Sequence, residues 1–280
     1  MCSFYPISAV WAAFYLGFLW LSTQRAFPPL LGYGAMLLVG ILLTVLLALE
    51  WSAHIPGRKA TLWLFLAGAA WWVASALLVR GDFAWRLWYS VNTLSLLLVT
   101  LSIGFWLAGE IERAGHLIPV CIVGTLVDIW SVLEGPSRRV GQQVVTHMQM
   151  QVDTGVRQPP PMVDFLVLHW PEPGADMMAP LVGLGDMVFV SLFLASCRRF
   201  GLSLTKCVVL VLAGLASAMA VAMWLEKPTP ALPFICGLFL LGNFRGLSMT
   251  RREWKITWVI AAAMILVGFA GYFRSFVLGG

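Results

Sequence analysis

Long apolar segments alternate with short polar ones along most of this 280-residue chain. Apolar runs of about 17 to 25 residues have the length that crosses a bilayer core as an α-helix. Nine runs are candidates for such helices. They cover residues 4–22, 29–49, 61–79, 87–108, 115–133, 181–197, 204–225, 230–244 and 255–275. The pattern therefore predicts an all-α membrane protein with about nine transmembrane helices, of which the eighth is short and flanked by prolines.

Only one connection between these runs is long, and it covers residues 134–180. Within it, "SRRVGQQVVTHMQMQV" (residues 137–152) has the character of an interfacial amphipathic helix. The segment "MVDFLVLHW" (162–170), bounded by "QPPP" and "PEPG", has the length and residue types of a strand. We therefore expect a short β-strand or hairpin in this loop, which makes the loop a candidate for function rather than a simple tether.

Composition supports a multi-pass membrane protein, because 60% of the residues are hydrophobic, 11% are charged and the mean hydropathy is +0.86. The first run lacks a preceding basic segment and a small-residue exit, so we interpret it as a retained helix and not a signal peptide. With nine spans, the N-terminal face holds 10 of the 18 Lys and Arg residues, which places the N-terminus in the cytoplasm and the long loop outside. No basic block is long enough to indicate nucleic-acid binding.

Cysteine and histidine patterns exclude several kinds of site. The five cysteines show no C-x-x-C spacing, and most lie in apolar runs, so we expect neither disulfides nor a metal centre. No H-E-x-x-H or G-x-S-x-G motif is present, which argues against a metalloprotease and a serine hydrolase. We expect all four histidines in loops or at the membrane interface, and no cofactor. They are His54, His116, His147 and His169.

Two acids lie well inside the apolar runs, and burying an ionised carboxylate in hydrocarbon is costly unless it is paired or hydrated. Asp128 is about six residues before the fifth run ends, and Asp186 is about five residues after the sixth begins. At 1.5 Å per residue, each lies roughly 8–9 Å from the same membrane face. Two antiparallel neighbouring helices would thus present carboxylates at matching depth.

Small residues and an irregular backbone accompany these acids. Gly124 stands four residues before Asp128, and Gly183 three before Asp186, on faces that allow membrane helices to approach closely. A third segment, "KPTPALPFICG" (227–237), enters from the same face, and its prolines leave backbone groups unpaired. Two acids and an irregular backbone therefore converge.

Paired carboxylates in a low-dielectric site share one proton, and this is the chemistry of aspartic proteolysis. The ionised member takes a proton from the attacking water, while the protonated member donates to the scissile carbonyl oxygen. From spacing alone, two other interpretations stay open: a proton relay in a transporter and a structural hydrogen-bonded pair.

Three short motifs carry a resemblance to a known family. Asp128 in "VDIWSVLEGPSR", "GLGD" at 183–186 and "PALP" at 230–233 resemble the signatures of the presenilin and signal peptide peptidase family of intramembrane aspartyl proteases. Their order, their spacing and the long loop between the aspartates also match. The resemblance covers about residues 117–244 and, for a chain this short, is closest to prokaryotic members.

The resemblance implies roles for seven residues. Asp128 and Asp186 would be the catalytic pair, and Gly183 and Gly185 would shape the active site around the second aspartate. Pro230, Ala231 and Leu232 would position substrate. It also implies a division into N-terminal transmembrane helices (1–110) and a catalytic transmembrane region (111–280) that contains the long loop 134–180.

Some features depart from the family pattern. Family members usually have Tyr before the first aspartate, whereas this chain has Val127, and one apparent span follows the "PALP" segment. The prepilin peptidases are a second G-x-G-D family of membrane aspartyl proteases. They usually have Lys shortly after the second aspartate and often a four-cysteine zinc motif, and this chain has neither. The "PALP" segment also favours the presenilin-like interpretation.

The expected protein is thus an integral, multi-pass enzyme of a prokaryotic cell membrane. Its partners would be the lipid bilayer and membrane-protein substrates with transmembrane helices, with no nucleic acid. Because a helix shields its peptide bonds, the substrate must unwind locally. We expect it to add as an extended strand to backbone near Pro230–Leu232, and also to the 162–170 segment.

Overall fold

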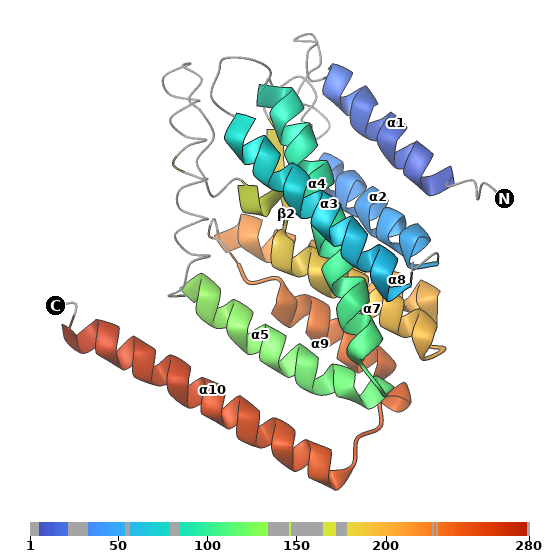
Figure 1. The fold of residues 1–280 in the computed structure, drawn as a ribbon. Coiled ribbons are helices and arrows are strands. Elements are labelled where there is room, and N and C mark those ends of the chain that lie inside the picture. Colours follow the sequence, from blue (N-terminus) through green and yellow to red (C-terminus); the bar gives the residue numbers. More distant parts are fainter. Residues whose placement is uncertain are drawn as a thin grey trace. The chain divides into compact units, whose positions relative to one another are not determined.

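The protein is described by a computed structural model that covers residues 6–21, 33–53, 57–78, 85–133, 146, 165–171, 178–225, 227 and 229–278. Within these residues the chain is mostly helical, with nine α-helices and one two-stranded sheet (Figure 1). The expected helical class with a β-hairpin in the long loop is confirmed. The interfacial helix expected over 137–152 falls, apart from Thr146, outside the described residues.

Membrane-crossing length and hydropathy are reached by three helices of the described part of the chain and not by nine. These are Trp88–Glu110, Ala114–Leu133 and Leu204–Leu225. Three further apolar helices are shorter: Pro6–Leu21, Leu38–Ala53 and Leu232–Gly246. These lengths and compositions are compatible with a membrane protein. The full set of nine spans is thus not shown, because several apolar runs contain helices of fewer than 18 residues.

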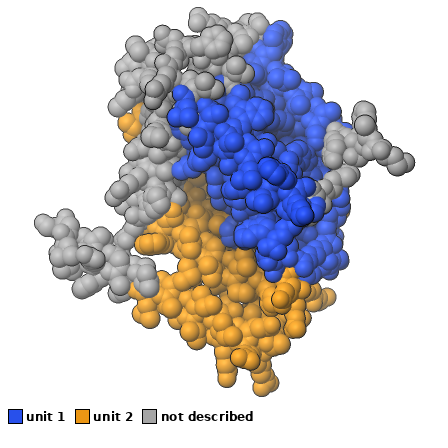
Figure 2. Space-filling view, viewed as in Figure 1, with its two compact units in different colours: residues 1–110, 150–204 blue, residues 111–149, 205–280 orange. Residues whose placement is uncertain are grey.

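The chain forms two compact units, shown in different colours in Figure 2. Unit 1 contains Met1–Glu110 and Met150–Leu204, and unit 2 contains Ile111–Gln149 and Thr205–Gly280. The chain first passes from unit 1 to unit 2 after Glu110, which is also the predicted end of the N-terminal region. Residues 150–204, however, group with the N-terminal helices, so the expected catalytic region contributes to both units.

Five helices of the described part of the chain belong to unit 1. Their bounds are α1 (Pro6–Leu21), α2 (Tyr33–Ala53), α3 (Arg58–Leu78), α4 (Trp85–Glu110) and α7 (Leu184–Arg199). Helix α4 packs on α3 and α7, and α2 packs on α1 and α7. At the crossing of α4 and α7, a Cβ at Gly104 would overlap the Ser191 hydroxyl and lie 2.6 Å from the Val188 carbonyl oxygen. Only glycine lets these two helices approach this closely.

The hairpin of unit 1 consists of β1 (Val167–Pro171) and β2 (Met178–Gly183), which pair antiparallel from Val167 opposite Gly183 to Pro171 opposite Met178. The strand expected over 162–170 is therefore present from Val167 onward, whereas Phe165 and Leu166 form a 3₁₀ turn and residues 162–164 lie outside the described part. The sixth apolar run was expected to be helical from residue 181, and this is wrong. Residues 181–183 are strand, because they pair with β1, and α7 starts only after Gly183.

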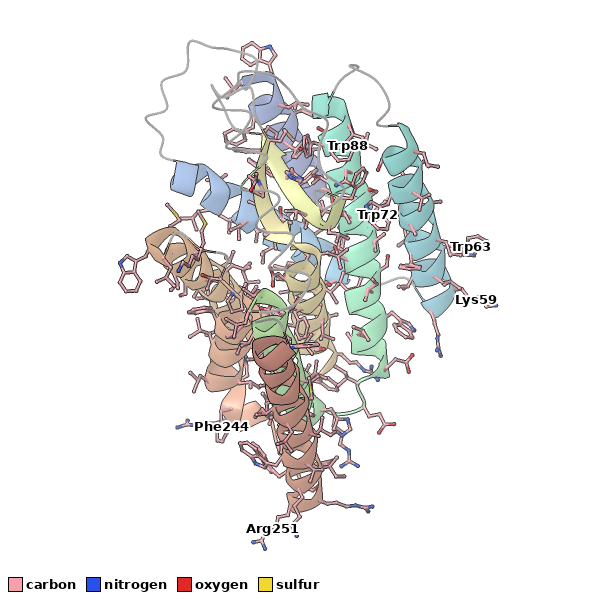
Figure 3. All side chains as sticks on the ribbon, turned by 90° about the vertical axis from the view of Figure 1, so that its left-hand side faces the viewer. Lys59, Trp63, Trp72, Trp88, Phe244 and Arg251 are labelled. Atoms are coloured by element: carbon pink, nitrogen blue, oxygen red, sulfur yellow. The ribbon has the colours of Figure 1, made fainter. Side chains whose placement is uncertain are left out.

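Aromatic side chains attach the hairpin to the helices of unit 1. The centroid of the Trp170 ring lies 5.2 Å from that of Tyr15 and 6.0 Å from that of Trp11, both on α1. In Figure 3, where Trp72 and Trp88 are labelled, these residues belong to α3 and α4. The Trp72 indole N–H donates to the Phe165 carbonyl oxygen at 2.9 Å, and the Trp88 ring lies 4.6 Å from that of Phe165. The hairpin is thus part of the core of unit 1 and not a free loop.

The described residues of unit 2 form four helices and two short 3₁₀ turns. They are η1 (Ala114–His116), α5 (Leu117–Leu133), α8 (Leu204–Leu225), α9 (Leu232–Asn243), η3 (Phe244–Gly246) and α10 (Arg251–Leu278). Helix α5 packs on α9 and α10. A Cβ at Gly214 of α8 would lie 2.7 Å from the Ile235 Cα atom, so α8 packs closely on α9. The thiols of Cys121 and Cys236 are in hydrogen-bond contact between α5 and α9.

Candidate functional site

Asp128 lies on α5 and faces the start of α9. Its Oδ2 atom accepts a hydrogen bond from the Leu232 N–H at 2.9 Å, and the Ala231 backbone also hydrogen-bonds to this carboxylate. The side chain is half-buried, and Val127 and Trp130 on the same helix are exposed. Two motif segments separated by 104 positions are therefore in direct contact within unit 2.

The "PALP" segment forms the N-terminus of α9. Ala231 is the residue that caps the helix, and Pro233 stands in its first turn. The first N–H groups of a helix have no partner within the helix, and a proline there removes one donor without cost. The N–H of Leu232 is satisfied by Asp128 instead. The Leu232 side chain is buried, at 6% exposure, and the backbone N–H makes the hydrogen bond to the carboxylate.

Asp186 lies in the first turn of α7, the helix that follows directly from β2. Gly183 ends the strand and precedes the helix, with extended dihedral angles of φ −69° and ψ 153°. A Cβ at Gly183 would lie 3.2 Å from the Asp186 Oδ2 atom, which is closer than ordinary van der Waals contact. Glycine at 183 therefore gives the carboxylate room, and any side chain there would crowd it.

Gly185, the other glycine of the "GLGD" motif, has a different environment. It is exposed, and a Cβ added there would meet nothing within 4 Å. Its φ angle is not in the left-handed region, where the only described glycine is Gly201. Space thus explains a glycine at 183, whereas neither space nor backbone conformation explains one at 185.

The two aspartates belong to different units, Asp186 to unit 1 and Asp128 to unit 2. Each half of the expected site is described within its own unit. Asp128 contacts the Ala231 and Leu232 backbone in unit 2, and Asp186 lies beside Gly183 in unit 1. The pairing of the two carboxylates stays a prediction.

Sequence reasoning missed a third acid, Glu50, because it follows directly after the second apolar run. Glu50 lies near the end of α2 and is buried, at 8% exposure. Its carboxylate accepts from the Ile7 N–H at 2.9 Å, the Ser8 N–H at 2.7 Å and the Ser8 hydroxyl at 2.5 Å. The carboxylate of one helix therefore caps the N-terminus of another. The sequence signal was an acid next to an interfacial tryptophan, Trp51.

Two arginines at the end of α7 donate hydrogen bonds to residues near the ends of neighbouring helices. Arg198 donates to the Ser52 hydroxyl at 2.7 Å and to the Leu49 carbonyl oxygen at 3.1 Å. Arg199 donates to the carbonyl oxygens of Ala108, at 2.6 Å, and Gly109. They thus satisfy carbonyl groups at the C-terminal ends of α2 and α4, where positive charge also complements the helix dipole.

The histidines were expected in loops or at the interface, and for His169 this is wrong. Its side chain is buried on β1, with its ring 4.4 Å from that of Tyr89. Burial lowers the pKa of His169 from 6.5 to about 3, so the imidazole is neutral near pH 7. His116 in η1 contacts Glu253 at 3.4 Å, and His54 and His147 lie outside the described residues.

Metal-binding chemistry is not indicated by the part of the chain that the structure describes, where no three His, Cys, Asp or Glu residues are grouped to hold an ion. The described cysteines are buried thiols that form no disulfide with one another: Cys121, Cys197, Cys207 and Cys236. No protein-family model, curated protein or solved structure significantly matches this chain.

Proposed function

We propose that this protein is an intramembrane aspartyl protease of the presenilin-like kind, which cuts peptide bonds in or near transmembrane segments of other proteins. One observation carries the proposal. The Leu232 N–H donates to the Asp128 carboxylate at 2.9 Å, so the "PALP" segment contacts one of the two expected catalytic acids. The two alternatives, a prepilin peptidase and a proton-coupled transporter, do not predict a contact between Asp128 and the "PALP" segment.

A multi-pass location in a membrane, which we propose to be a prokaryotic cell membrane, agrees with the exposed apolar faces of the helices. Trp63 on α3 is 70% exposed, and Figure 3 shows it pointing away from the helices. Trp258 and Val259 on α10 are 62% and 67% exposed. Large apolar side chains on so much of a surface would promote aggregation in water, but in a bilayer they contact lipid chains. The proposed architecture extends this to about nine spans.

The catalytic step needs only the two carboxylates and water. In the proposed mechanism, one ionised aspartate takes a proton from water while the oxygen attacks the scissile carbonyl carbon. The protonated partner donates its proton to the carbonyl oxygen. Collapse of the tetrahedral intermediate breaks the C–N bond, the leaving nitrogen takes a proton, and the pair again shares one proton. No cofactor is needed.

A purely structural role for Asp128 must be separated from this mechanism, because its carboxylate also caps α9. Asparagine caps helices about as well as aspartate, since its side-chain oxygen accepts the same hydrogen bonds. Asp128→Asn therefore keeps the cap and removes the acid. The same holds for Asp186→Asn, which keeps the size of the side chain beside Gly183.

The test is cleavage of a reporter transmembrane substrate in proteoliposomes. We expect Asp128→Asn and Asp186→Asn each to reduce the cleavage rate at least about 10³-fold with unchanged thermal unfolding. Glu50→Gln, a change at a capping carboxylate outside the motifs, should keep activity. Cleavage by the wild type should also show a bell-shaped pH profile. Activity in both aspartate variants would overturn the proposal, and proton flux without cleavage would favour the transporter.

A further inference from the structure

We infer that Thr93 on α4 is a positioning residue for Asp186, an inference that rests on the proposed function. The Thr93 hydroxyl, itself buried, bonds to both backbone groups of His169 on β1. It accepts from the His169 N–H at 3.1 Å and donates to the His169 carbonyl oxygen at 3.3 Å. A side chain of a helix thus acts here as the hydrogen-bond partner of a strand.

The hairpin has a local reason to need this partner. The residue opposite His169 is Pro180, which has no N–H to donate, and the register shifts between Leu168 and His169. The hairpin alone therefore cannot supply a regular ladder at this point. A buried backbone group without a partner is costly, and the Thr93 hydroxyl satisfies both groups.

The position of β1 determines the position of Asp186 through the paired strand β2. Val167 on β1 pairs with Gly183, which is the last residue of β2 and the residue that precedes α7. The Asp186 carboxylate lies beside Gly183, within 3.2 Å of where a Cβ would be. No loop separates the strand from the helix, so a shift of β1 moves the first turn of α7 and its carboxylate.

Helix α4 also fixes the other side of Asp186. The Ser191 hydroxyl on α7 lies 3.2 Å from the Thr100 carbonyl oxygen and 2.9 Å from those of Met187 and Val188 in its own helix, next to the close approach at Gly104. Thr93, Thr100 and Gly104 are seven and four residues apart, so they share one face of α4. One helix therefore holds both the strand before Asp186 and the helix after it.

The experiment compares threonine-to-valine changes at two buried positions of α4. Thr93→Val removes the hydroxyl that holds β1. Thr100→Val is the matched control, because the Thr100 hydroxyl bonds only to the Leu96 and Leu97 carbonyl oxygens of its own helix. Tyr15→Phe is a second control, since the Tyr15 hydroxyl also hydrogen-bonds to Thr93. Thr93→Ser keeps a hydroxyl at this position and should therefore keep the exchange rate and kcat of the wild type.

Two readouts are needed: amide hydrogen exchange of residues 178–187, and kcat and KM for the reporter substrate. For Thr93→Val we expect exchange about tenfold faster and kcat about 10- to 100-fold lower at nearly unchanged KM, because misplacing a catalytic group by about 1 Å costs about 100-fold. Both control variants and Thr93→Ser should stay within about threefold of the wild type.

The outcomes separate this inference from the proposed function. An inactive wild type would overturn the proposed function. An active wild type whose Thr93→Val variant keeps its kcat, or loses it together with the Thr100→Val variant, would overturn the positioning role alone. Unchanged exchange in Thr93→Val would overturn it whether or not the protein cleaves the reporter.

Discussion

Each unit contains a helix whose N-terminus is capped by a carboxylate from another helix, and the two caps differ in their surroundings. In unit 1, Glu50 is buried, and both of its oxygens are bonded to the first residues of α1. In unit 2, Asp128 is half-buried, and its Oδ2 atom accepts from Leu232. Burial and three hydrogen bonds to α1 fit a structural role for Glu50, whereas capping alone does not explain why Asp128 is only half-buried.

The helices around these acids show the same contrast. In unit 1, 67% of the most apolar window of Trp88–Glu110 is buried within the protein. In unit 2, the corresponding fraction is 22% for Ala114–Leu133 and 28% for Leu204–Leu225. Unit 1 is thus held by buried polar links and close contacts around α4, whereas most residues of the two long apolar helices of unit 2 are not buried. An acid on such a helix is accessible in a way that Glu50 is not.

The largest effect is expected at the close contact that holds unit 1 together. Gly104→Ala places a Cβ against the Ser191 hydroxyl and the Val188 carbonyl oxygen, so we expect unfolding to become easier by about 2–3 kcal/mol. Gly109→Ala, on the same helix, meets nothing within 4 Å and should be neutral or slightly stabilising. Denaturant unfolding in detergent micelles measures both. Equal stability of the two variants would contradict the central role of α4.

An intermediate effect on the free energy of unfolding is expected when His169 is exposed to acid. Its pKa is about 3 in the folded protein and 6.5 when unfolded, so the unfolded chain binds one more proton between these values. Stability should therefore be complete above pH 6.5 and fall below it, by up to about 1.4 kcal/mol per pH unit. Thermal unfolding of the wild type and of His169→Phe at pH 7.5 and 5.5 measures this. A wild type that loses no more stability in acid than the variant would refute the neutral, buried histidine.

The smallest effect is expected at the capping carboxylate of unit 1. Glu50→Gln leaves one oxygen to accept from the start of α1, but its NH2 group cannot accept the bonds that the other carboxylate oxygen makes, so a loss of about 1 kcal/mol is expected. Glu110→Gln is the control, because Glu110 forms an exposed ion pair with Arg58, which contributes little. A Glu110 variant that is the less stable of the two would reverse the contrast between buried and exposed carboxylates.

Helical class and the general location of the hairpin were predictable from sequence, because apolar run length and the residue types of 162–170 report local preferences. Where α7 starts was not predictable in the same way. Leu181 and Val182 are as suitable for a membrane helix as for a strand, and pairing with β1, a tertiary effect, decides between them. This places Asp186 in the first turn of its helix.

For the candidate site, sequence spacing brought attention to Asp128, Gly183 and the "PALP" segment, and the structure shows the contacts that each makes in its own unit. It could not reveal Glu50, Thr93 or His169. Their importance comes from partners 42 to 76 positions away, and no local pattern encodes such partners. The sequence around Thr93 does not show that its hydroxyl bonds to a strand, because that strand is far away along the chain.

The bond between Glu50 and the start of α1 has a consequence for how the chain is made. Ile7 and Ser8 are synthesised some 42 to 43 positions before the carboxylate that binds them. During translation, the first helix therefore enters its surroundings with unpaired amides, and it gains its lasting partner only when the second helix is complete. The two helices thus form one unit of biogenesis, in which the later segment secures the earlier one.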